Sequence, residues 1–179
     1  MALPHLILHA GALGDLVLTV QLARHLAGAG VALEALARVP LGTLPGAAAV
    51  VHDIEGRGTQ WLYVEDERPA PETLRAAVAG RTVLNALGAA GGLVHRRLVR
   101  AGARSVLSVD PPARAGDERH ITTQWLEQLR PQLAGPGVAE EWAGARGVLE
   151  RLGDGVVRDD DGLIGASGGG RALLAQWGG

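Results

Sequence analysis

The fold of this 179-residue chain is decided by the stretch Leu6-Ile7-Leu8-His9-Ala10-Gly11-Ala12-Leu13-Gly14-Asp15-Leu16-Val17-Leu18. Its opening apolar run predicts a buried strand. The glycines that follow predict a tight turn, and the apolar residues beyond Asp15 recur at helical spacing until Gly28 ends the helix. A strand, a glycine turn and a helix in this order are typical of the first unit of an α/β domain.

The alternation of strands and helices continues along the chain. The pattern predicts further strands over 31–39, 48–54, 61–64, 81–87 and 105–109, and helices over 71–79, 92–101 and 121–133. Strands alternating with helices indicate βαβ units and right-handed crossovers. We therefore expect a Rossmann-like, doubly wound parallel sheet with strand 6–8 at or near its centre and helices on both faces.

The character of the chain changes after residue 134. Gly135-Pro136-Gly137 breaks the pattern, a further helix is expected over 139–152, and an acidic, glycine-rich stretch follows. We expect a Rossmann-like domain over 1–134, followed by a poorly packed region over 135–179 that holds a linker and a fragment of a second domain.

Composition excludes several classes of function. The formal net charge of −2 does not indicate the excess of basic residues that is typical of nucleic-acid-binding proteins. The absence of cysteine excludes disulfides and thiolate metal sites, and the histidines lack metal-ligand spacing, so we expect neither a metal nor a cofactor. No apolar stretch is long enough to span a membrane and no basic leader is present. We expect a cytoplasmic location with at most peripheral membrane contact.

The first turn is the strongest candidate site. A glycine loop that opens onto a helix N-terminus presents bare N–H groups at the edge where α/β sheets bind ligands. The turn has neither the third glycine of a dinucleotide loop nor the Lys-Ser/Thr pair of a phosphate loop. Asp15 has two interpretations, which can coexist: it caps the helix, or it takes a proton from a substrate hydroxyl.

This opening stretch resembles that of glycosyltransferase family 9, the group that includes the lipopolysaccharide heptosyltransferases. The resemblance implies one half of a GT-B architecture, in which an N-terminal domain holds the acceptor and a C-terminal domain holds the nucleotide-sugar. The implied reaction is inverting transfer of a sugar to a glycan or lipid-linked acceptor. The catalytic base proposed for the family corresponds to Asp15, and the implied acceptor-side residues are Gly11, Ala12, Leu13, Gly14 and His120.

The tail resembles the start of the family's donor domain. The stretch Ile164-Gly165-Ala166-Ser167-Gly168-Gly169-Gly170 is similar to its first strand and loop, which makes Ser167 and Gly168 candidate donor-binding residues. The family's lysine position is occupied by Ala175. Because the remainder of that domain is not in the sequence, we expect nucleotide-sugar binding only if a second domain is supplied. The alternative is a non-catalytic α/β binding module or pseudoenzyme.

Overall fold

The computed structural model describes residues 3–38, 42–44, 49–65, 67–110, 119–135 and 138–153. Six strands form one sheet in the order β3-β4-β2-β1-β5-β6. Five of them are parallel, and β3 runs antiparallel to β4 at one edge. Their bounds are β1 (His5–His9), β2 (Leu33–Ala37), β3 (Gly42–Leu44), β4 (Ala49–Asp53), β5 (Thr82–Ala86) and β6 (Ser105–Ser108).

Strand β1 lies at the centre of the sheet. It pairs with β2 on one side and β5 on the other, so that Ile7 lies opposite both Ala35 and Leu84. All five residues of β1 are buried, because both faces of a doubly wound sheet are covered by helices. The predicted Rossmann-like fold with a central first strand is confirmed.

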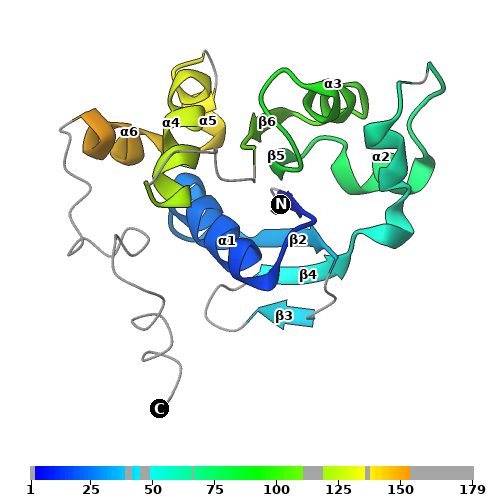
Figure 1. Ribbon diagram of the computed structural model, residues 1–179, viewed down its shortest axis with the longest axis horizontal. Helices are drawn as coiled ribbons and strands as arrows, with labels where there is room; N and C mark the ends of the chain where they lie inside the picture. Colours follow the sequence, from blue (N-terminus) through cyan, green and yellow to red (C-terminus); the bar gives the residue numbers. More distant parts are fainter. Residues whose placement is uncertain are drawn as a thin grey trace.

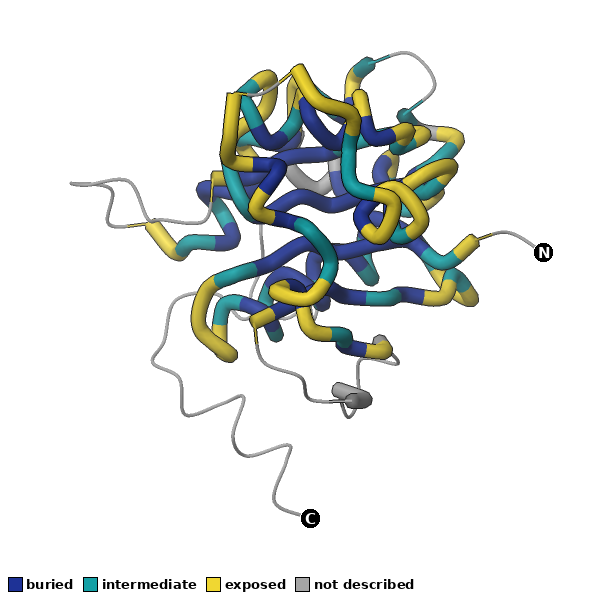
Figure 2. The backbone as a smooth tube through the Cα atoms, turned by 90° about the vertical axis from the view of Figure 1, so that its right-hand side faces the viewer, coloured by how far each residue is buried: buried dark blue, intermediate teal, exposed yellow. Residues whose placement is uncertain are grey.

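Helices cover both faces of the sheet (Figure 1). One core contains Ile7 and the other contains Leu6 and Leu8, because neighbouring side chains of a strand point to opposite faces. The buried backbone runs between these layers (Figure 2). The Ile7 face carries α1 (Leu13–Ala27), α4 (Ile121–Leu133), α5 (Val138–Glu141) and α6 (Ala145–Gly153), and the other face carries the 3-10 turns η1 (Glu55–Arg57) and η2 (Thr59–Tyr63) with α2 (Glu72–Val78) and α3 (Leu93–Arg100).

The prediction of a strand over 61–64 is wrong. The structure forms the 3-10 turn η2 there, which buries both Trp61 and Leu62 against the sheet. A strand would have sent these neighbours to opposite faces, and a short apolar run does not distinguish the two conformations by periodicity. The short edge strand β3 lies in a stretch where no strand is predicted from the sequence.

The expectation of poor packing beyond residue 135 is wrong for residues 138–148. Trp142 is fully buried and shares a core with α1 and α4. The Gly144 amide donates a hydrogen bond of 2.8 Å to the carbonyl of Leu26 at the end of α1. A Cβ atom on Gly144 would lie 1.9 Å from the carbonyl oxygen of His25, so only glycine permits this approach. Residues 154–179, which include the stretch that resembles a donor-domain start, lie outside the described residues.

Among the described residues, no helix combines the length and the apolar character needed to cross a membrane.

Candidate functional site

The β1–α1 turn leaves the N-terminus of α1 bare. Residues 11–14 are exposed at the carboxyl end of the central strand. The N-cap residue of α1 is Ala12, whose side chain has no hydrogen-bond acceptor, and no side chain caps the helix. The first amides of a helix have no partner within the helix. Because residues 11–14 are exposed, these amides lie at the edge where doubly wound sheets bind ligands.

Asp15 is the third residue of α1 and not its N-cap. The interpretation of Asp15 as the capping residue is therefore wrong, although a carboxylate in the first helical turn still interacts favourably with the helix dipole. Its backbone carbonyl accepts a hydrogen bond of 2.7 Å from Thr19 Oγ1. Within the described ranges, its half-buried carboxylate has neither a hydrogen-bond nor an ion-pair partner.

His9, the last residue of β1, lies beside this carboxylate. The sequence alone predicts no function for this histidine. The side chain is 1% exposed, and neither ring nitrogen has a hydrogen-bond partner in the described part of the protein. Burial lowers the pKa of His9 below its usual 6.5, and the negative charge of Asp15 opposes that shift. Burial therefore favours the neutral form of His9.

Gly11 lies between these two side chains. A Cβ atom on Gly11 would lie 3.0 Å from Cε1 and 3.2 Å from Nε2 of His9, and 3.5 Å from Oδ2 of Asp15. Because glycine leaves this volume free, an imidazole nitrogen and a carboxylate oxygen both border the space at Gly11. The arrangement can accept a hydroxyl hydrogen at Asp15. The one feature of the sequence that could have indicated a role for His9 is its position at the end of the predicted central strand.

The neighbouring strand ends carry a different polar cluster. Asn85 Nδ2 donates to Ser108 Oγ at 2.9 Å and to the carbonyl of Gly88 at 3.1 Å, while its Oδ1 accepts from the Leu87 amide at 3.0 Å. Ser108 Oγ also lies 2.9 Å from His95 Nδ1. Burial lowers the pKa of His95, and the nearby Arg96 lowers it further. Asn85 and Ser108 are fully buried, so this cluster holds β5, β6 and α3 together.

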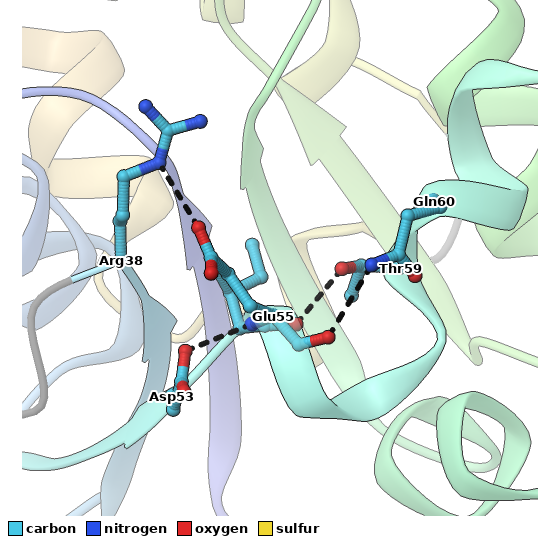
Figure 3. A network of polar contacts seen from close by, with 6 residues as sticks. Arg38, Asp53, Glu55, Thr59 and Gln60 are labelled. Atoms are coloured by element: carbon cyan, nitrogen blue, oxygen red, sulfur yellow. Dashed lines mark hydrogen bonds and ion pairs between the residues drawn. The ribbon is translucent and has the colours of Figure 1, made fainter.

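A third cluster occupies the carboxyl ends of β2 and β4 (Figure 3). Asp53 Oδ1 accepts from the Glu55 amide at 2.9 Å, and Arg38 Nε lies 3.7 Å from Glu55 Oε1. Thr59 Oγ1 donates to the carbonyl of Ile54 at 2.8 Å. Each of these contacts joins η1 or η2 to the strand ends. The cluster fixes the two 3-10 turns against the sheet.

The remaining sequence candidates are not brought to Asp15 by any contact in the described ranges. His120 is the N-cap of α4, where its Nδ1 accepts from the Thr122 amide at 3.4 Å and lies 2.8 Å from Thr122 Oγ1. These contacts give His120 a capping role. Ser167 and Gly168 lie outside the described residues.

No group of three or more metal-ligating side chains occurs among the described residues. Comparisons with protein-family models, with curated proteins and with solved structures find no match to this chain. The functional argument therefore rests on the fold and on the geometry of the β1–α1 turn.

Proposed function

We propose that this chain is the acceptor-side unit of an inverting glycosyltransferase similar to family 9, with Asp15 as its general base. In the proposed reaction, Asp15 takes the proton of an acceptor hydroxyl as the hydroxyl oxygen attacks the anomeric carbon of a nucleotide-sugar. The nucleoside diphosphate leaves with the electron pair of the broken bond. The acceptor is a glycan or a lipid-linked sugar.

The observation that carries this proposal is the carboxylate of Asp15, which has no hydrogen-bond or ion-pair partner among the described residues. A carboxylate that capped the helix would have its oxygen engaged by backbone amides, but the N-cap of α1 is Ala12. Asp15 therefore combines a stabilising helix dipole with an oxygen that is free to accept a proton. A half-buried acid in such a position is typical of a functional group at a ligand-binding edge.

The position of the turn in the sheet supports the same proposal. From β1 the chain continues through α1 to β2 on one side, and it later returns to β5 on the other side of β1. The sheet therefore reverses its strand order between β1 and β5. In open α/β sheets, ligands bind outside the carboxyl ends of the strands at such a reversal.

The neutral state of His9 is compatible with a basic Asp15. A protonated imidazole this close would pair with the carboxylate and occupy the oxygen that the acceptor hydroxyl needs. Burial favours the neutral imidazole instead. We infer that His9 leaves the negative charge of Asp15 available for the acceptor hydroxyl.

The test is turnover of Asp15→Asn, measured as release of nucleoside diphosphate with an acceptor glycan and a donor-binding domain supplied in trans. We expect a loss of about 10²–10⁴-fold, the usual contribution of a general base. The thermal unfolding midpoint should change little, because Ala12 and not Asp15 is the N-cap.

The matched control is Asp110→Asn, which removes an exposed carboxylate that follows β6 at the same edge of the sheet. This variant should keep its turnover. Full turnover in a folded Asp15→Asn protein would end the catalytic role of Asp15 and leave a non-catalytic binding module as the better account.

A further inference from the structure

Three arginines of α3 line a hollow on the face of the sheet opposite α1. Arg96, Arg97 and Arg100 border a volume of about 380 Å³, together with Leu93 on the same helix. Glu65 and Glu67, in the segment that follows η2, form the other wall. Asp15 belongs to α1 on the Ile7 face, so the hollow is separate from the β1–α1 turn.

Arg97 is a buried cation that forms no ion pair with any carboxylate of the described residues. Its side chain is 5% exposed, and its guanidinium carbon lies 4.2 Å from the ring centroid of Trp61. Nη2 donates to the carbonyl of Val64, while Nη1 has no partner within the described ranges. A buried charge is costly unless it is paired. The ring of Trp61 offsets part of this cost, and no carboxylate of the described residues offsets the rest.

Arg96 and Arg100 flank this buried charge and are exposed. Arg96 Nη1 donates to the carbonyl of Gly91 at 2.6 Å, and Arg100 Nη2 donates to the carbonyl of Glu67 at 2.6 Å. A guanidinium has five N–H donors, so these contacts orient each group and leave most of its donors free. In the described part of the chain, neither Glu65 nor Glu67 forms an ion pair with the three arginines.

We propose that this hollow binds the phosphate group of a small hydroxylated molecule through Arg96 and Arg100, beside the buried charge of Arg97. The planar guanidinium matches the geometry of phosphate oxygens and forms charge-assisted hydrogen bonds with them. The carboxylates of Glu65 and Glu67 can accept hydrogen bonds from hydroxyl groups of the same ligand. They also repel further negative charge, which favours a phosphate monoester over a polyanion.

The test uses the whole chain and two probes, inorganic phosphate and glycerol phosphate, titrated by calorimetry at fixed ionic strength. We expect saturable binding of both probes, with tighter binding of glycerol phosphate. The double substitution Arg96→Gln and Arg100→Gln should weaken the binding of each probe about tenfold or more, because two charge-assisted hydrogen-bonding groups are lost. Both side chains are exposed, so the fold should survive.

Two further variants make the result specific to the hollow. Arg75→Gln removes an exposed arginine of α2 that pairs with Glu72, and it should leave the affinity unchanged. Glu65→Gln with Glu67→Gln should strengthen the binding of inorganic phosphate, because it removes negative charge from the wall. Absence of saturable binding would overturn the proposal, as would an equal loss of affinity in Arg75→Gln. Neither result bears on the role of Asp15, which lies at the separate β1–α1 turn.

Discussion

Two corners at the carboxyl edge of the sheet differ in whether their polar groups have hydrogen-bond partners. In the α3 corner, defined by Asn85, His95 and Ser108, buried polar side chains hydrogen-bond to one another. In the α1 corner, defined by His9, Ala12 and Asp15, a buried imidazole lacks partners, a helix N-terminus lacks a side-chain cap, and a carboxylate is unpaired among the described residues.

The difference separates groups that hold the fold from groups that are available to a ligand. Buried polar groups in native proteins are almost always paired, so each exception needs an explanation. Unsatisfied groups lower stability, and they persist where a protein gives up stability for function. The polar contacts of the α3 corner therefore stabilise the edge of the sheet, and the α1 corner is where we propose that the acceptor binds and reacts.

The largest effect on stability is expected in the α3 corner. Asn85→Ala removes the donor to Ser108 and the acceptor for the Leu87 amide, and it leaves His95 Nδ1 as the remaining side-chain contact of the buried Ser108 hydroxyl. The free energy of unfolding should fall by about 1–3 kcal/mol. Urea unfolding followed by circular dichroism measures this difference. An unchanged midpoint would mean that this cluster does not stabilise the edge.

A smaller effect of opposite sign is expected at the uncapped helix. Ala12→Ser supplies the N-cap oxygen that α1 lacks, and it should raise the free energy of unfolding by about 1 kcal/mol. The control is Ala90→Ser, at an exposed position outside any helix, which should change stability little. Equal midpoints for the two serine variants would show that the N-terminus of α1 is already satisfied.

The smallest effect is expected at His9, and it depends on pH. Burial lowers the pKa of His9 in the folded protein, so the unfolded chain binds the proton more readily and stability falls as the pH drops below about 6.5. His9→Leu should reduce this loss between pH 7.5 and 5.5. At pH 7.5 it should change stability by less than about 1 kcal/mol, because the His9 ring nitrogens have no hydrogen-bond partner among the described residues.

The measurement is thermal unfolding of both proteins across that pH range. The pKa values of His5 and His95 are shifted in the same direction, so the pH dependence should shrink in the variant without vanishing. An identical pH dependence in the two proteins would show that His9 titrates normally in the folded state.

Local sequence patterns predict much of this molecule. The strand–turn–helix unit around Gly11 follows from apolar spacing and glycine placement, and the alternation that follows it predicts the parallel sheet. The pattern fails at η2, where a short apolar run fits either conformation. It also fails for Trp142, because the burial of that side chain depends on contacts with distant helices.

The candidate site also contains features that the sequence predicts and features that it does not. Asp15 is recognisable from its place after a glycine turn, but the assignment of Ala12 as the N-cap depends on where the first helical turn begins. The position of His9 beside Asp15 depends on how the strand end meets the helix start. The contact between Asn85 and Ser108 requires the register of β5 with β6, which no local pattern encodes.

The approach of Gly144 to the end of α1 sets an order of assembly during synthesis. A ribosome releases the N-terminal residues first, so β1 and α1 emerge long before their partners. The pairing of β1 with β5 requires the chain to be synthesised as far as β5. The contact of α1 with Trp142 requires a still longer chain. Contacts so distant in sequence form late and slowly. The part of α1 that packs against Trp142, Ala145 and Val148 can be covered only after these residues have been synthesised.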